Sequence, residues 1–157
     1  MTYEEFAGDD DVFLPKLRVT KIHPDAIIPK YQTSGSSGFD FHCVDDFVIY
    51  PFETKLIKTG LCFDIPHGYE LQIRSRSGLA LKHSIVVLNS PATIDSDYTG
   101  EVAIILCNFG VREIAFKKGD RIAQGVLCMV DYLPIEEVNS ITKTTERGSG
   151  GFGSTGI

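Results

Sequence analysis

Apolar and polar residues alternate with a period of two along several short stretches of this chain. In the stretch "YELQIRS", Tyr69, Leu71 and Ile73 fall on one face, and the residues between them are polar. The stretch 61–65, "LCFDI", follows the same rule. Such alternation is typical of β-strands that turn one face toward a core. We therefore predict short strands here, with the apolar residues pointing inward.

Two longer stretches, 101–109 and 121–133, are apolar on both faces. A strand of this kind is expected inside a sandwich or barrel, where both of its faces are covered. Glycine and proline interrupt the chain at short intervals between such stretches, as residues in turns do. The pattern predicts an all-β fold, either a sandwich, a barrel or a jelly roll. The best helix within the body is one or two turns in "SGLALKH", which begins at Ser77.

Composition places this pattern in one domain with two peripheral segments. The chain has 157 residues, of which 43% are hydrophobic and 23% are charged. These values are ordinary for a globular domain with a sizeable core. We expect an acidic N-terminal extension at 1–13, a β-barrel body at 14–146 and a glycine-rich C-terminal segment at 147–157.

Charge and targeting signals narrow the classes of partner. The formal net charge of −6 argues against broad nucleic-acid binding, which needs a basic face. It leaves room for a small anionic ligand, because a few arginines in one cleft suffice to bind one. No apolar run approaches the ~20 residues of a membrane span, and residues 1–13 lack the apolar region of a secretory signal. We expect an intracellular protein, cytoplasmic or nuclear, that is not secreted and has no membrane partner.

The four cysteines are Cys43, Cys62, Cys107 and Cys128. None belongs to a CxxC pair, and none stands at metal-ligand spacing from a histidine. We expect them to be reduced and buried, where they serve as small hydrophobic side chains.

The stretch "SRSGLA" (75–80) combines arginine with the beginning of a short helix. A helix N-terminus offers free backbone N–H groups and the positive end of a dipole to a phosphate. The planar guanidinium of Arg76 matches phosphate oxygens, and Arg74 shares its face if the strand alternation continues. The alternative is a surface strand end with solvated arginines.

In "NSPATIDSDYTGE" (89–101), Asp95 and Asp97 flank a serine and precede Tyr98. A carboxylate aimed into a phosphate-rich pocket can act as a general base toward water or can hold a metal ion. The alternative is a simple turn, because Asp-Ser-Asp ahead of a glycine is favourable turn chemistry.

Three further stretches have both a chemical and a plainer explanation. In "GDRIAQ" (119–124), Gln124 lies among apolar residues and needs hydrogen-bond partners, which a core amide would also find. In "SGSSGFDF" (34–41), Asp40 stands at the beginning of a strand, or the stretch is only a loop. The stretch "RGSGGFGSTG" (147–156) resembles a flexible linker or a cradle of backbone N–H groups for phosphate.

Taken together and in order, these stretches resemble the five motifs of the trimeric dUTP pyrophosphatase (dUTPase) family. "SGFDF" is similar to motif 1, "RSGLA" to motif 2 and "NSPATIDSDYTGE" to motif 3, while "GDRIAQ" is similar to motif 4 and "RGSGGFGSTG" to motif 5. Each is weak alone, but five in order between residues 37 and 156 favour the functional explanation of each. The resemblance implies a jelly-roll-like β-barrel of many short strands with one short helix, assembled as a homotrimer.

The resemblance also implies Mg²⁺-dependent hydrolysis of dUTP to dUMP and pyrophosphate. The family's general base is the first aspartate of motif 3, so that role falls on Asp95, which would activate a water for in-line attack on the α-phosphorus. Mg²⁺ and arginine stabilise the charge of the leaving pyrophosphate. Mg²⁺ would be held mainly by substrate phosphates and water, and no protein ligand is assigned to it.

The same resemblance implies which residues contact the rest of the nucleotide. Tyr98 would pack under the deoxyribose and exclude a 2′-hydroxyl. Asn89 and the backbone of Ala92, Thr93 and Ile94 would read the uracil edge. The remaining expected contacts are Arg76, Ser77, Gly78, Gln124 and Arg147 on phosphates, Phe152 on uracil, Gly153, Ser154 and Thr155 on the γ-phosphate, and Asp40 supporting the water shell of the metal or a neighbouring arginine.

In this family each active site draws on three chains, so a monomer would be inactive. Motifs 1, 2 and 4 come from one chain, motif 3 comes from a second, and the C-terminal segment of a third closes over the nucleotide as a lid.

The chain departs from the usual motifs at four positions. Ala92 stands where motif 3 usually has glycine, and its methyl group would crowd the uracil hairpin if that position needs a positive φ. Ser75 stands where proline is frequent, Phe39 where tyrosine is commoner, and Gly125 where a bulky aliphatic residue is usual.

Two alternatives share the fold. A dCTP deaminase has similar phosphate motifs but acts at the base, whereas the "IDSDY" context and the closing segment favour the hydrolase. A regulatory protein could instead bind dUTP as a switch ligand, and the acidic residues 1–13 are the obvious place for such a second role.

Overall fold

A computed structural model describes residues 15–152 and 154 of the chain. The expected N-terminal extension, 1–13, lies outside the described residues, and so do Gly153 and Thr155. In the described part, no helix is both long enough and apolar enough to cross a membrane.

Short strands make up nearly all regular structure in the described residues. The elements are β1 (Arg18–Lys21), β2 (Phe39–His42), β3 (Phe47–Ile49), β4 (Thr54–Asp64), β5 (Tyr69–Arg74), α1 (Ser77–His83), β6 (Ile85–Val87), β7 (Ala92–Ile94), β8 (Glu101–Asn108), β9 (Ile114–Phe116) and β10 (Arg121–Met129). The helix covers the predicted stretch "SGLALKH" and ends at Ser84, whose left-handed conformation (φ 55°) stops it.

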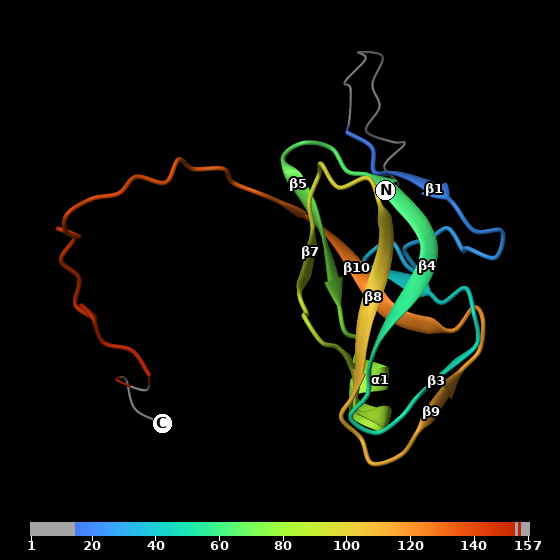
Figure 1. Ribbon diagram of the computed structural model, residues 1–157. Helices are drawn as coiled ribbons and strands as arrows, with labels where there is room; N and C mark the ends of the chain where they lie inside the picture. The colour runs from blue at the N-terminus through green and yellow to red at the C-terminus, as the bar shows by residue number, and fades with distance from the viewer. Residues whose placement is uncertain (1–14, 153, 155–157) are drawn as a thin grey trace.

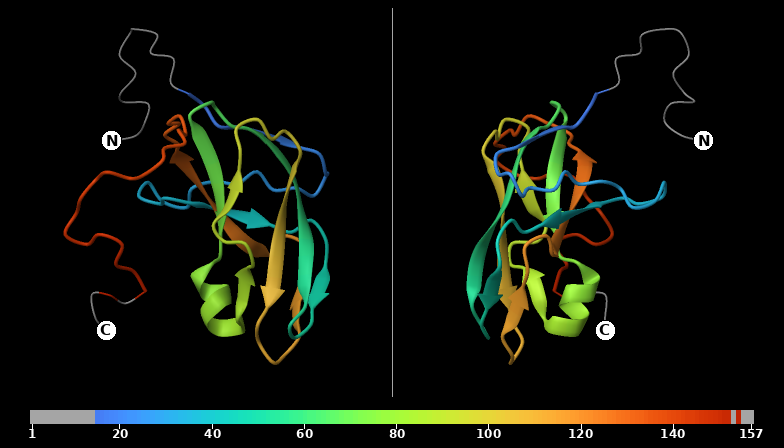
Figure 2. Two further views of the ribbon diagram at one scale, coloured as in Figure 1. Left: turned by 60° about the vertical axis from the view of Figure 1, so that its left-hand side comes forward. Right: turned by 90° about the vertical axis from the view of Figure 1, so that its right-hand side faces the viewer.

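The strands form two four-stranded sheets that enclose the core (Figures 1 and 2). One sheet has the order β1-β4-β8-β6 and the other the order β2-β10-β5-β7, while β3 and β9 form a small third sheet. Every pairing is antiparallel. This architecture confirms the prediction of an all-β, jelly-roll-like fold with one short helix.

The predicted strand faces are confirmed by burial. Leu71 and Ile73 of β5 are buried, and Tyr69, the first residue of the strand, is half-buried and packs against the core. The apolar residues of the stretch 61–65 are buried in the same way. Because strand side chains alternate between faces, the polar residues of β5 lie on the outer face of its sheet.

Two predictions about the longer stretches need correction. In β8, Val102, Ile104 and Leu106 are buried, but most side chains of the opposite face are only half-buried. The stretch 121–133 is a strand only to Met129, because β10 loses its partner there. Val130 still donates its N–H to the oxygen of Gly68 at 2.9 Å, and beyond it the chain leaves the sheet.

The cysteines are free, as expected for reduced thiols. Their predicted burial is correct for Cys43 and Cys107 but wrong for Cys62 and Cys128, which are half-buried. Cys62 and Cys128 sit on the outer sides of β4 and β10, where neighbouring polar residues admit solvent.

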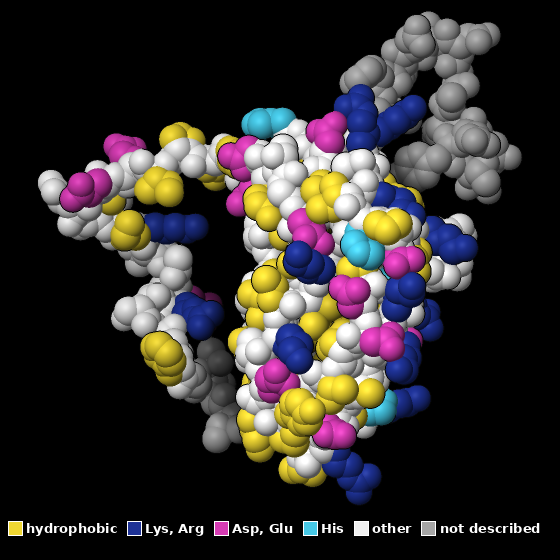
Figure 3. All heavy atoms as spheres, turned by 45° about the vertical axis from the view of Figure 1, so that its right-hand side comes forward, with side chains coloured by type: hydrophobic (Ala, Val, Ile, Leu, Met, Phe, Trp, Pro, Cys, Tyr) yellow, Lys and Arg dark blue, Asp and Glu magenta, His cyan; other side chains and the backbone are white. Residues whose placement is uncertain are grey.

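Residues 130–152, hereafter the C-terminal arm, extend away from the body (Figures 1 and 3). Large apolar side chains along the arm are exposed: Tyr132 at 62%, Leu133 at 82%, Ile135 at 101% and Ile141 at 81%. Isolated chains rarely leave so many adjacent apolar side chains in water unless another surface covers them.

Candidate functional site

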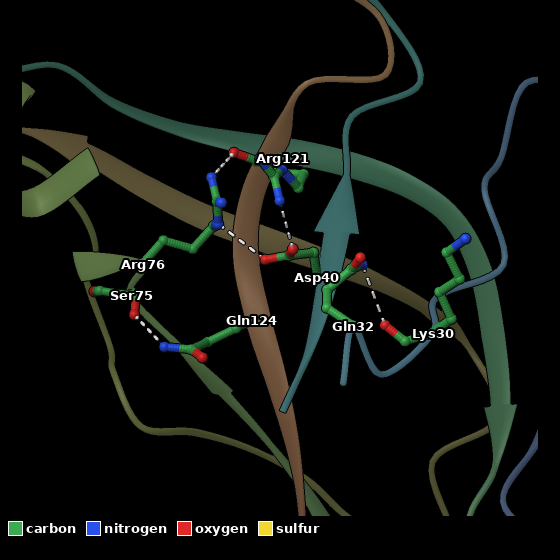
Figure 4. A network of polar contacts seen from close by, with 7 residues as sticks. All are labelled: Lys30, Gln32, Asp40, Ser75, Arg76, Arg121 and Gln124. Carbon is green, nitrogen blue, oxygen red and sulfur yellow. Dashed lines mark hydrogen bonds and ion pairs between the residues drawn. The ribbon is translucent and has the colours of Figure 1, made fainter. Parts of the chain in front are cut away.

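One carboxylate between two arginines organises the end of the sheet β2-β10-β5-β7 (Figure 4). Asp40 of β2 accepts a hydrogen bond from Nε of Arg76 at 2.9 Å, and its second oxygen pairs with Nη1 of Arg121 at 3.2 Å. Arg76 also donates from Nη1 to the carbonyl oxygen of Arg121 at 3.0 Å. Two guanidinium groups share one carboxylate, so the cluster carries a net positive charge that can attract an anion.

Strand pairing brings motifs 1, 2 and 4 to this one place. In β10, Gln124 is the register partner of Asp40 on β2 and of Arg74 on β5. Its Nε2 donates to the carbonyl oxygen of Ser75 at 2.9 Å (Figure 4). Gln124 therefore finds the hydrogen-bond partner that a half-buried amide needs in Ser75, the residue directly before Arg76.

The helix α1 begins directly after this cluster. Arg76 is the N-cap, with an extended backbone (φ −87°, ψ 128°), and no side chain caps the helix. Ser77 and Gly78 are exposed at the first turn. Their backbone N–H groups have no partner within the helix, since those of the first turn never do, and they follow Arg76 directly in the chain.

The turn that carries Asp95 follows β7 and lies at the opposite end of β5. Asp95 is exposed and follows β7, and its carbonyl oxygen accepts a hydrogen bond from the N–H of Tyr98 at 3.1 Å. The stretch is therefore a turn, as one explanation predicted, and this turn presents the carboxylate to solvent. Tyr98 donates its hydroxyl to the oxygen of Glu101 at 2.9 Å, and its ring lies against Gly100.

Ala92 fits the hairpin without backbone strain. The non-glycine residues with positive φ in the described part are Phe52, Ser84 and Phe152, so the condition for crowding by Ala92 is not met. Ala92 pairs with Ile73 across β5 and β7 and packs against the core. Its methyl group therefore contributes apolar contact at the base of the hairpin.

Asp95 and Arg76 of one chain are far apart. Ile94 pairs with Leu71 near the beginning of β5, whereas Arg76 follows the other end of that strand. Asp95 follows Ile94 and so comes level with Glu70, six residues before Arg76. At about 3.3 Å per residue, this separation corresponds to about 20 Å. The two side chains of one chain therefore cannot contact the same phosphate group.

The expected lid residues that the structure describes are Arg147, Phe152 and Ser154, and the arm that carries the first two extends away from the body. Arg147 donates from Nε to the oxygen of Gly150 at 2.9 Å within the arm. Phe152 is fully exposed, with φ 49°, and Ser154 is also exposed. Figure 1 shows the arm on one side of the body, separated from β2 and α1.

Two residues beside the cluster were missed by sequence reasoning. Arg121, within motif 4, shares Asp40 with Arg76. His42 lies on the same face of β2 as Asp40 and opposite Arg121 in the β-ladder, and its Nδ1 is buried without a partner in the described residues. Burial lowers the pKa of His42, and the two arginines add to that effect, while Asp40 opposes it. The two-residue spacing from Asp40 was the signal that could have revealed His42.

A pocket in the body of the chain lies apart from the motif residues. It measures about 650 Å³ and opens between the end of α1 and the loop 110–114, with Lys82, His83 and Arg112 in its lining. None of its lining residues belongs to the five motifs.

The chain is similar to known proteins over most of its length. It is 50% identical over 145 residues to a deoxyuridine 5′-triphosphate nucleotidohydrolase of Helicobacter pylori, a match that covers 90% of this chain and 97% of the relative. It is 55% identical over 140 residues to the enzyme of the same name from Picosynechococcus, covering 89% and 98%. The dUTPase of Staphylococcus bacteriophage 80alpha, solved with dUPNHPP, superposes with a TM-score of 0.86 at 26% identity, covering 92% of this chain and 100% of that one.

The model of the dUTPase family matches residues 24–156, which include all five motifs. The curated relatives named above carry the name of the same enzyme over most of this chain. This chain therefore belongs to the dUTPase family.

Proposed function

We propose that this protein hydrolyses dUTP to dUMP and pyrophosphate in active sites that three copies of the chain build together. The observation that carries the proposal is the distribution of the motifs. All five are present, yet one chain leaves them in three places: around Asp40, around Asp95 about 20 Å along the sheet, and in the arm. A neighbouring copy can supply what each place lacks, as closed symmetric assemblies do.

The first place, hereafter the phosphate half-site, consists of Asp40, Arg76, Ser77, Gly78 and Gln124. Asp40 fixes the guanidinium of Arg76 through a 2.9 Å ion pair, so the cation is already oriented when the nucleotide arrives. Preorganised donors of this kind stabilise charge that develops in a transition state. Of the two roles expected for Asp40, this contact favours support of a neighbouring arginine over support of the metal's water shell.

The second place, hereafter the base half-site, consists of Asn89, Ala92, Thr93, Ile94, Asp95 and Tyr98. The hairpin backbone and Asn89 would recognise the uracil edge, and Tyr98 would cover the deoxyribose. Asp95, exposed on its turn, would take the proton of the water that attacks the α-phosphorus. A general base must reach that water directly, and an exposed carboxylate on a fixed turn can do so from a neighbouring chain.

The third place is the C-terminal arm with the residues that follow it, which together would close over the nucleotide of another copy. Arg147 would lie against the phosphates, Phe152 would stack on the uracil, and Gly153, Ser154 and Thr155 would bind the γ-phosphate. The exposed apolar residues of the arm support this assignment, because a neighbouring barrel would remove them from water.

The reaction also calls for Mg²⁺, which would neutralise the charge of the triphosphate and its leaving group. Asp40 is already paired with arginines, and in residues 15–152 and 154 no three His, Cys, Asp or Glu side chains gather into a metal site. Mg²⁺ retains several waters and binds substrate phosphates readily. The oxygen atoms of the substrate, rather than a cage of side chains, would therefore hold it.

The direct test is pyrophosphate release from dUTP compared with dTTP, dCTP and UTP, each with and without Mg²⁺. We expect release from dUTP alone, dependence on Mg²⁺, and a trimeric mass by light scattering. Ammonia release from dCTP without dUTP cleavage would instead identify a deaminase. Tight dUTP binding without any cleavage would favour the regulatory alternative.

A further inference from the structure

Ser75 makes three hydrogen bonds, one to β10 and two to the turn that follows β6. Its carbonyl oxygen accepts from Nε2 of Gln124 in β10 at 2.9 Å. Its Oγ accepts from the backbone N–H of Val87, the last residue of β6, at 2.9 Å. Its own N–H donates to Oγ of Ser90 at 3.4 Å. No other role has been given to this residue, which lies directly before Arg76.

The partners of Ser75 belong to both half-sites. Gln124 is part of the phosphate half-site, where Figure 4 shows it reaching Ser75 beside Arg76. Val87 and Ser90 form the turn that leads into β7, since the N–H of Ser90 donates to the oxygen of Val87 at 3.2 Å. The base half-site is built on this turn, on β7 and on the turn that follows β7.

We propose that Ser75 is a positioning residue that holds the phosphate half-site and the base half-site of one chain in a fixed relation. The inference rests on the proposed function. Because the two half-sites of one chain serve two different active sites in the trimer, Ser75 sits where neighbouring active sites meet. Displacing it disturbs base recognition in one site and phosphate binding in the next.

In this chain the hydroxyl of Ser75 is the acceptor for a buried backbone N–H group. Val87 is buried, with 3% of its surface exposed, so its N–H loses its partner when Oγ is removed, and an unpaired buried donor shifts until it finds another. Alanine removes Oγ and keeps the N–H. Threonine keeps both groups and tolerates extended backbone.

The test measures ligand binding at the two half-sites separately in the full-length protein. Inhibition constants of deoxyuridine, which has base and sugar only, and of inorganic pyrophosphate are determined against dUTP for Ser75→Ala and Ser75→Thr. Thr20→Val is the matched control, since it removes an exposed hydroxyl on β1, far along the chain from every motif. KM, kcat and trimer mass are recorded for each protein.

We expect Ser75→Ala to raise both inhibition constants about threefold to tenfold, the loss that one hydrogen bond implies, while the trimer persists. Ser75→Thr should restore both values to within about twofold. Three results would overturn the inference. They are weaker binding of pyrophosphate alone, unchanged inhibition constants for both probes, and a threonine variant that behaves like the alanine variant.

A second variant covers the case in which Ser75→Ala does not fold. Ser90→Ala removes an exposed partner of Ser75 and should also raise both inhibition constants, with wild-type values counting against the inference. The wild-type protein decides the proposed function separately. If it fails to cleave dUTP, that function is wrong, whereas cleavage combined with unchanged Ser75 variants removes only the role of Ser75.

Discussion

At the scale of the residue, the chemistry depends on a carboxylate whose position is set by a turn. Asp95 is exposed, and the 3.1 Å hydrogen bond from Tyr98 to its carbonyl oxygen holds the turn. We predict that Asp95→Asn keeps the turn and dUTP binding but loses nearly all turnover, by about 10²-fold or more, because an amide cannot take a proton. Single-turnover kinetics and equilibrium binding of dUTP check this result. Retained turnover with Asn at this position would assign the base to another group.

Gly125 illustrates a departure from the family motif that the structure explains. A Cβ at Gly125 would lie 2.7 Å from Cε2 of Phe41 and 2.8 Å from Cε2 of Phe39. Both rings are buried in the core, so the space that a bulky aliphatic residue would fill is occupied by aromatic carbon. The two rings therefore explain Gly125, whereas nothing in the structure explains Phe39 in place of tyrosine. The contact could not be predicted from sequence because residues 39 and 125 are distant in the chain.

We predict that Gly125→Ala lowers the free energy of unfolding by about 1–3 kcal/mol, the usual cost of overpacking a core. Urea denaturation of the single variant and of Gly125→Ala combined with Phe39→Leu measures it. The smaller side chain should recover part of the loss, so the two changes should not add. Equal stability of Gly125→Ala and the wild type would show that the rings move aside freely.

His42 makes the free energy of unfolding depend on pH. Burial lowers the pKa of His42 below its ordinary value of about 6.5. Between that value and the lowered pKa, the unfolded chain binds the proton and the folded chain does not, so stability falls as pH falls through this range. The effect is absent above about pH 7, where both states are neutral at this residue.

We therefore predict that urea midpoints decrease between pH 7 and pH 5.5, and that His42→Gln reduces this decrease. His83→Gln is the matched control, because His83 is exposed at the end of α1. A pH dependence that His42→Gln leaves unchanged would place its origin elsewhere.

At the scale of the element, period-two alternation predicted strands well where one face meets the core. Leu71 and Ile73 in β5 are buried as expected. The continuous apolar pattern of 121–133 was misleading at the end of β10, because apolar residues continue into the arm while the pairing partner stops at Tyr69. An apolar stretch indicates that its side chains are covered, but it does not indicate whether the same chain or a neighbouring chain covers them.

The arm has few means of stabilising its own barrel. Its last described residues bond within the arm, as in the pair Arg147–Gly150. We predict that deletion of residues 147–157 leaves the thermal midpoint within about 2 °C of the wild type, a surface-sized effect, while kcat/KM for dUTP falls by about 10²-fold or more, the cost of losing a closing lid with its charged contact. Circular dichroism and steady-state kinetics decide the outcome. An unfolded truncated protein would show that the segment is structural.

At the scale of the whole molecule, the motifs in the sequence indicated the components of a site but not their positions. Spacing could not reveal that Asp40 and Arg76 form an ion pair, because β2 and β5 meet only through β10. Nor could spacing reveal that Asp95 lies at the other end of β5 from Arg76. Both facts follow from strand order and register, which depend on contacts between residues distant in the chain.

That separation leads to a test of the shared site with two inactive proteins. One carries Asp95→Asn with an intact arm, and the other carries Asp95 but lacks residues 147–157. In the trimer proposed above, each site takes Asp95 and the lid from different chains. Random mixing of equal amounts therefore gives about one quarter of the sites both parts, since each chain is correct with a probability of about one half.

We expect the mixture, denatured and refolded together, to recover about a quarter of wild-type turnover, and each protein refolded alone to remain inactive. Mixing without refolding is the control, because intact trimers exchange chains only as fast as they dissociate. If Asp95 and the lid of the same chain served one site, mixed trimers would contain no complete site, and refolding together would restore nothing.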